Sequence, residues 1–103
     1  MALSDEPRFA AAIACFKRRD FHAAHELWEM LWNEAQGPDR DFLAALVQIA
    51  AGFLKLASEQ RAGAAKLFDR GSRRLEPFPA RYAGLDVAAL REMVEAVSRR
   101  CTA

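Results

Sequence analysis

Residues 42–54 read FLAALVQIAAGFL, and this stretch decides the fold class. Gln48 is its only polar side chain, so a helix built from it is apolar on every face. Such a helix is stable in water when other helices surround it. Its 13 residues fall short of the roughly 20 that cross a bilayer. The stretch therefore predicts an apolar central helix over residues 40–57 and no membrane span.

The composition outside this stretch also favours helices. The 103 residues include 22 Ala and 11 Leu, but only six Ile and Val together and one Thr. Strands favour β-branched residues, whereas helices favour Ala, Leu, Arg and Glu. With 52% hydrophobic and 28% charged residues, the chain is typical of a folded domain. We expect one all-α domain over residues 1–103, a bundle of about five helices.

Start and stop signals divide the chain into these helices. Ser4, Asp20 and Asp86 each precede a helical pattern and predict N-terminal caps. Gly37-Pro38 ends the second helix, and Ser58-Glu59 separates the central helix from the fourth. The second to fourth helices should therefore form the centre of the bundle.

Two glycines in the fourth helix predict a close contact with a neighbour. Gly63 and Gly71 flank Leu67 at four-residue steps along one ridge. Because each glycine costs a helix interior about 1 kcal/mol relative to alanine, we expect a neighbouring helix to approach both closely.

The last helix carries an apolar seam at alternating steps of three and four residues. This heptad-like spacing favours packing against another helix, within the domain or on a second subunit. The sequence thus allows a homo-oligomer formed through Val87, Leu90, Val94 and Val97.

Cysteine usage and the N-terminus indicate neither a disulfide framework nor a secretory leader. Cys15 and Cys101 lie far apart in the chain without metal-ligand spacing. Residues 1–6 contain no basic region followed by an apolar run. We expect a cytoplasmic protein.

The residues with chemical content lie in the second helix, which reads His22-x-x-His25-Glu26-x-x-Glu29-x-x-Trp32. At about 100° per residue, His25 borders the apolar face one turn from Glu29, and Glu26 points away from His25. A metal would find the pair His25 and Glu29 or the pair His22 and Glu26, but no histidine on another helix. The spacing predicts no metal site and no cofactor.

Two interpretations of His25 and Glu29 remain. A carboxylate one turn from an imidazole can support proton transfer, so His25, Glu29 and Glu26 are the catalytic candidates. The alternative is a hydrogen-bonded pair at the core edge, with the Trp32 indole and Gln48 completing a polar network. We favour the structural interpretation, because buried polar networks often serve packing specificity and no Ser or Cys nucleophile lies nearby in sequence.

The same residues resemble a known family. The signature of the second helix, followed by Arg40, the Ala-rich helix with Gln48 and the glycine of the fourth helix, is similar to domain of unknown function 309, a small bacterial and archaeal family. The resemblance extends over residues 19–97 and includes Tyr82-x-Gly84-Leu85-Asp86-Val87. It implies an all-helical bundle and no established activity. It also implies a polar cluster at His25, Glu26, Glu29, Trp32, Arg40 and Gln48, to which we add His22 as a binding candidate.

Charge is distributed unevenly, with −3 over residues 1–50 and +4 over residues 51–103, because five basic and eight acidic groups are followed by ten basic and six acidic. Without a recognition motif, this imbalance makes nucleic acid an unexpected partner. The apolar seam of the last helix and the lack of a complete catalytic set favour a non-catalytic binding or scaffolding module. The alternative is a small enzyme or metal-assisted catalyst that uses His25 and Glu29 as an acid/base or ligand pair, with Arg40 holding an anionic substrate.

Overall fold

The structure is a computed structural model that describes residues 2–103. These residues form five α-helices and one small hairpin. In chain order the elements are a 3₁₀ turn (Leu3–Asp5), α1 (Pro7–Lys17), α2 (Phe21–Glu34), α3 (Gly37–Ala57), α4 (Arg61–Leu75), β1 (Arg81–Tyr82), β2 (Leu85–Asp86) and α5 (Val87–Thr102). This confirms the predicted all-α, single-domain bundle. Within residues 2–103, no helix is both long and apolar enough to cross a membrane.

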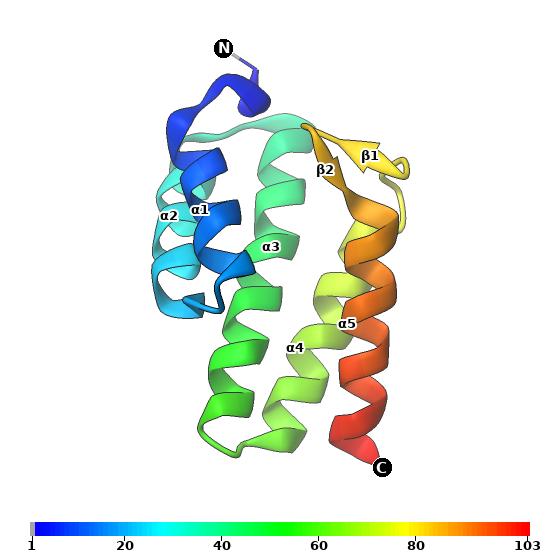
Figure 1. Ribbon diagram of the computed structural model, residues 1–103. Helices are drawn as coiled ribbons and strands as arrows, with labels where there is room; N and C mark the ends of the chain where they lie inside the picture. The colour runs from blue at the N-terminus through cyan, green and yellow to red at the C-terminus, as the bar shows by residue number, and fades with distance from the viewer. Residues whose placement is uncertain (1) are drawn as a thin grey trace.

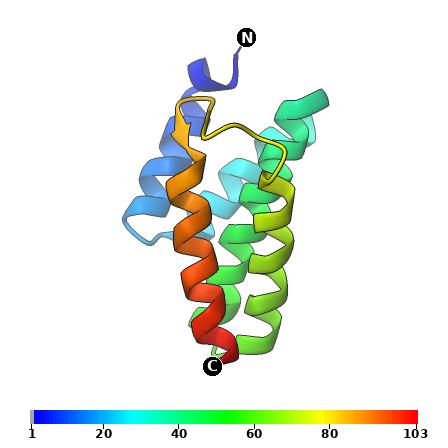
Figure 2. The same ribbon diagram turned by 90° about the vertical axis from the view of Figure 1, so that its right-hand side faces the viewer.

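α3 is the centre of the bundle. It packs against α2 on one side and α4 on the other, while α1 packs on α2 and α5 packs on α4 (Figure 1). The view toward α5 shows α4 and α5 side by side, with α1 and α2 on the far side of the molecule (Figure 2). The buried residues of α3 are Phe42, Leu43, Ala45, Leu46, Ile49, Ala50 and Gly52. The predicted central core helix is therefore confirmed.

Local capping explains where three helices begin. The Asp20 carboxylate accepts a hydrogen bond from the Ala23 N–H at 3.3 Å, and that of Asp86 accepts one from Ala89 at 3.0 Å, as predicted. The predicted Ser4 cap is wrong, because Ser4 lies inside the 3₁₀ turn. Glu6 caps α1 instead, and its side chain accepts the Arg8 N–H.

The contact between α3 and α4 depends on two glycines. A Cβ at Gly71 would lie 2.7 Å from Ile49 Cγ1, and one at Gly52 would lie 2.6 Å from the Phe68 ring. Both positions therefore require glycine for close packing. Gly63 does not, since the nearest side-chain atom to its Cβ position is Lys55 Cδ at 3.7 Å. The predicted close approach is right for Gly71 and wrong for Gly63.

The apolar seam of α5 is largely covered within the chain. Val87, Leu90 and Val94 are 1%, 9% and 0% exposed, because α5 lies on α4. These three residues therefore belong to the core of the domain, and a homo-oligomer through the seam stays a prediction. Val97, in the C-terminal half of α5, is half-buried.

The hairpin between α4 and α5 is anchored to the start of α3. The Tyr82 hydroxyl donates a hydrogen bond to Asp39 Oδ1 at 2.7 Å, and this bond raises the pKa of Tyr82 to about 12. Its ring lies 4.7 Å from that of Phe42, between ring centroids. The turn residues Ala83 and Gly84 both have positive φ, at 51° and 79°. This hairpin was not predicted from the sequence.

Candidate functional site

The two histidine–glutamate pairs of α2 form as the helical spacing predicts, but they face different surroundings. His22 Nε2 lies 2.9 Å from Glu26 Oε1, and their side chains are 74% and 62% exposed. His25 Nδ1 lies 3.5 Å from Glu29 Oε2, with the imidazole only 25% exposed. Of the two pairs, only His25 and Glu29 lie at the edge of the core.

Arg40 and Trp32 form a separate contact at the turn between α2 and α3. The Arg40 guanidinium carbon lies 4.1 Å from the centroid of the Trp32 ring, and Arg40 Nη1 donates a hydrogen bond to the Trp32 carbonyl at 3.1 Å. A guanidinium over an indole face is a stabilising cation–π contact. Arg40 therefore contacts the C-terminal part of α2, beyond Glu29.

The polar network expected around Gln48 does not form. Gln48 Oε1 is buried and accepts no hydrogen bond from any residue in the described range 2–103. The Trp28 indole N–H is likewise buried without a partner there. The seven residues of the predicted cluster thus separate into two histidine–glutamate contacts, one stacked pair and one isolated amide.

This arrangement does not create a reaction chamber. None of the seven predicted residues lines any of the three best-formed pockets on the described part of the surface. Within residues 2–103, no three His, Cys, Asp or Glu side chains come close enough together to hold a metal ion. Glu29 is 50% exposed, so water reaches the His25–Glu29 pair freely.

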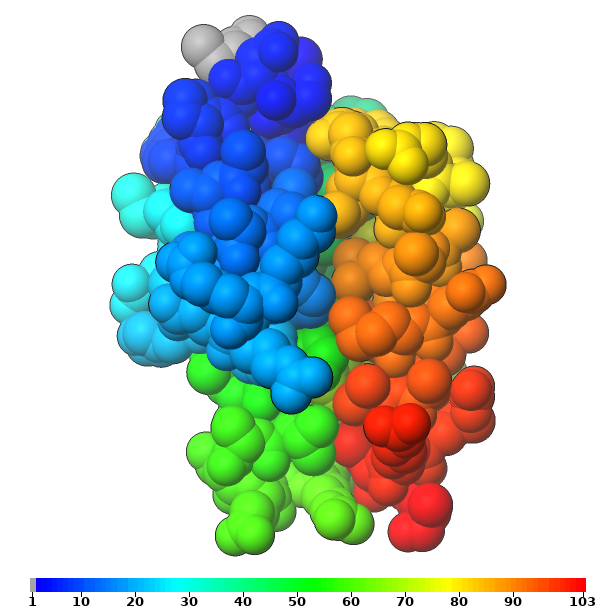
Figure 3. All heavy atoms as spheres, in the orientation of Figure 1, coloured from blue at the N-terminus to red at the C-terminus, as the bar shows by residue number. Residues whose placement is uncertain are grey.

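A different site results from the unequal lengths of the helices. α1 has 11 residues and α3 has 21, which correspond to about 16 Å and 31 Å of helix. α1 ends beside the middle of α3 and leaves the C-terminal part of α3 uncovered on that side (Figure 1). The space-filling view is hollowed there, below the end of α1 and beside α5 (Figure 3).

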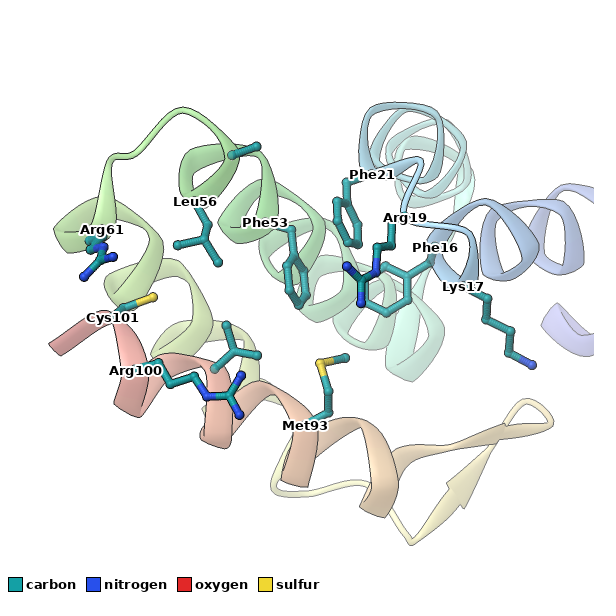
Figure 4. A pocket seen from close by; sticks show the side chains of 12 residues that line it. Phe16, Lys17, Arg19, Phe21, Phe53, Leu56, Arg61, Met93, Arg100 and Cys101 are labelled. Atoms are coloured by element: carbon teal, nitrogen blue, oxygen red, sulfur yellow. The ribbon is translucent and has the colours of Figure 1, made fainter. Parts of the chain in front are cut away.

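This hollow is a pocket of about 660 Å³, here called the Phe53 groove (Figure 4). Its walls are largely apolar and come from the end of α1, the start of α2, the end of α3 and the second half of α5. The apolar side chains are Phe16, Phe21, Phe53, Leu56, Met93 and Val97. All six are half-buried, so the groove is the uncovered edge of the core.

Three phenylalanine rings form one rigid wall of the groove. Phe21 and Phe53 are stacked with ring centroids 4.4 Å apart. Phe16 meets both rings edge-on, at 5.3 Å from Phe21 and 5.6 Å from Phe53. Phe53 in turn contacts the buried Phe68 at 4.8 Å. Aromatic pairs of this geometry are mutually stabilising, so the wall is preformed.

The charged residues of the groove all carry the same sign. Lys17 and Arg19 lie on one side, and Arg61 and Arg100 lie on the other (Figure 4). The lining contains no carboxylate and no histidine. Within the described residues, none of these four cations has an ion-pair partner within 4.0 Å, in contrast to Arg8, Arg73 and Arg91.

The sequence reasoning missed this site, although three signals for it were present. Phe16 is followed directly by a basic run through Arg19. The apolar stretch of the central helix continues to Leu54, much further than the first helix can cover. The seam of the last helix also reaches Cys101, which lines the groove.

Fold and site together define a small all-helical protein with an aromatic, basic-rimmed groove and a His-Glu-x-x-Glu-x-x-Trp helix. The family model named domain of unknown function (DUF309) matches residues 9–67, more than half of the chain, so the chain belongs to this family. The match includes the signature helix and begins earlier than the resemblance traced in the sequence. It ends before the hairpin at residues 81–86. No curated protein matches the chain.

Proposed function

We propose that this chain is a non-catalytic binding protein and that the Phe53 groove is its binding site. The observation that carries the proposal is the groove itself. Small-molecule sites typically measure about 300–1,000 Å³ and combine apolar walls with a few charged groups. At about 660 Å³, with an aromatic wall and four cations, the Phe53 groove has these properties.

The chemistry of the lining favours binding over catalysis. Acid/base catalysis needs a proton-transfer group within reach of a bound substrate. The histidines and glutamates of α2 lie outside the groove, and its lining contains no carboxylate. The alternative function, an enzyme based on His25 and Glu29, would require a substrate held on an open helix surface. Arg40, its expected anion anchor, is engaged with Trp32.

The His25–Glu29 pair has a structural role in this proposal. We expect His25→Ala and Glu29→Gln each to lower the free energy of unfolding by up to about 1 kcal/mol, because each removes a half-buried contact at the core edge. In a domain of this size, 1 kcal/mol corresponds to a fall of roughly 4–8 °C in Tm. Thermal melting by circular dichroism measures this fall.

The exposed pair provides the matched control. His22→Ala and Glu26→Gln remove the same atoms from side chains that are 74% and 62% exposed, so Tm should stay within about 2 °C of wild type. If His25→Ala and Glu29→Gln melt like wild type, the pair is not structural and the catalytic alternative gains weight.

Filling the groove with a larger side chain should weaken the binding of an apolar probe. Ala57 lines the groove, is exposed and ends α3, so Ala57→Trp fills the groove without removing a core contact. We expect the neutral fluorophore N-phenylnaphthylamine to bind wild type and to bind Ala57→Trp at least about tenfold more weakly, a loss of about 1.4 kcal/mol. Fluorescence titration measures both affinities.

Ala10→Trp is the control for this titration. Ala10 is equally exposed on a helix but does not line the groove, so this variant should bind the probe like wild type. A wild-type protein that does not enhance probe fluorescence would refute the proposed function. Equal loss of binding in both variants would place the probe outside the groove.

A further inference from the structure

We propose that the ligand of the Phe53 groove is an amphipathic carboxylate, with an alkyl chain along the phenylalanine wall and the carboxylate among the rim cations. This inference rests on the proposed function and adds the chemical class of the ligand. Two observations carry it, the sign of the charges and the size of the lining, and the backbone at Arg19 offers a way to test it.

The charges select an anion. Four cations line one apolar groove in a chain whose net charge is only +1. None of them is neutralised by a carboxylate of the described residues within 4.0 Å. A cleft with one sign of charge and low-dielectric walls concentrates ligands of the opposite sign. Guanidinium groups bind carboxylates with paired hydrogen bonds, and three of the four cations are arginines.

The backbone at Arg19 makes this rim cation replaceable by glycine. Arg19 has φ 67°, in the left-handed region that favours glycine. It ends α1 in a Schellman motif, in which the Arg19 N–H donates to the Phe16 carbonyl at 3.0 Å and the Asp20 N–H donates to the Cys15 carbonyl at 2.8 Å. Glycine would form this turn with less strain, so arginine contributes its charge at a conformational cost.

Glu59 shows that the strain alone is not specific to the groove. It ends α3 in the same motif with φ 60°, where the Gln60 N–H donates to the Lys55 carbonyl at 2.9 Å. Glu59 does not line the groove. The chain therefore contains a matched pair of sites with the same backbone and different surroundings.

The size of the lining favours a small molecule over a protein partner. Twelve residues line the groove. A stable protein interface uses roughly 20–30 residues on each side. The aromatic wall offers a continuous apolar surface next to the cations, as an alkyl chain ending in a carboxylate requires (Figure 4).

Competition between detergents of opposite charge tests this inference. Laurate and dodecyltrimethylammonium carry similar alkyl chains with opposite charges. We expect laurate to displace N-phenylnaphthylamine from wild type at concentrations at least about tenfold lower than dodecyltrimethylammonium does. All concentrations are kept below those at which micelles form. Added salt should reduce this preference, because it screens exposed charges over about 8–10 Å.

Variants of the matched pair, Arg19 and Glu59, test which residues cause the preference for laurate over dodecyltrimethylammonium. Arg19→Gly should reduce the preference for laurate at least about threefold, while Tm stays equal or rises, because glycine relieves the backbone strain. Glu59→Gly relieves the same strain outside the groove and should leave the preference unchanged. Arg100→Gln removes a rim cation without changing the backbone conformation and should also reduce the preference.

The outcomes separate this inference from the proposed function. If the probe binds and both detergents displace it equally, the groove does not select anions and this inference is wrong, while the binding function stands. If Arg19→Gly and Arg100→Gln both retain the wild-type preference, the rim cations are not the carboxylate site. If neither the probe nor laurate binds wild type, the proposed function fails as well.

Discussion

Replacement of Phe68 by alanine is expected to lower the free energy of unfolding by about 3–5 kcal/mol, the largest effect we predict. Phe68 is 0% exposed and fills the contact between α3 and α4. Its ring lies where a Cβ at Gly52 would be, so α3 is shaped to receive it. Because small domains are stable by only about 5–15 kcal/mol, this loss removes a large fraction of the stability. Urea unfolding followed by circular dichroism measures it.

Two control variants test whether the loss of stability comes from the buried volume of the Phe68 ring. Phe68→Leu retains part of the buried volume and should cost clearly less than Phe68→Ala. Met30→Ala removes a large apolar side chain that is 48% exposed on α2, and its effect should stay within about 0.5 kcal/mol. A cost below about 1 kcal/mol for Phe68→Ala would contradict the tight packing of α3 on α4.

The second large effect is that alanine should change the free energy of unfolding in opposite directions at two glycines of α4. Gly71→Ala places a methyl group 2.7 Å from Ile49 Cγ1 and 3.2 Å from the Ala45 carbonyl oxygen. Overpacking of this kind costs about 1–3 kcal/mol and exceeds the gain in helix propensity of up to about 1 kcal/mol. We therefore expect Gly71→Ala to be less stable than wild type by about 1–2 kcal/mol.

Gly63→Ala is the matched change with the opposite expectation. The added methyl group would meet only Lys55 Cδ at 3.7 Å, an ordinary contact. Its gain in helix propensity should raise the free energy of unfolding by about 0.5–1 kcal/mol. Thermal melting of both variants measures the difference, and a Gly71→Ala protein that melts at or above the wild-type temperature would refute the close approach.

The parts of the fold that depend on local chemistry could be predicted from the sequence. Asp20 and Asp86 cap their helices because each carboxylate accepts a hydrogen bond from the backbone N–H three residues later, a contact that depends on local sequence alone. The same reasoning failed at Ser4, since Glu6 next to Pro7 offers a competing cap. The hairpin was missed because its turn is Ala83-Gly84, and alanine carries no preference for positive φ.

The parts of the site that depend on tertiary packing could not be predicted. The spacing of His25 and Glu29 on one helix fixes their contact, and that contact forms. Gln48 is expected in the same cluster because a buried amide needs partners and because the family resemblance implies it, but the direction of its side chain depends on neighbouring helices. The Phe53 groove depends on where α1 ends relative to α3 and on the position of α5, neither of which periodicity determines.

In the proposed function, the Phe53 groove, and not the signature helix α2, is the binding surface of the protein. Amide chemical shifts of isotope-labelled wild-type protein during a laurate titration test this claim most directly. We predict that the largest shifts fall at Phe53, Val97 and Cys101, three residues that line the groove on α3 and α5. Shifts centred on His25 and Glu29, or no shifts at any residue, would contradict it.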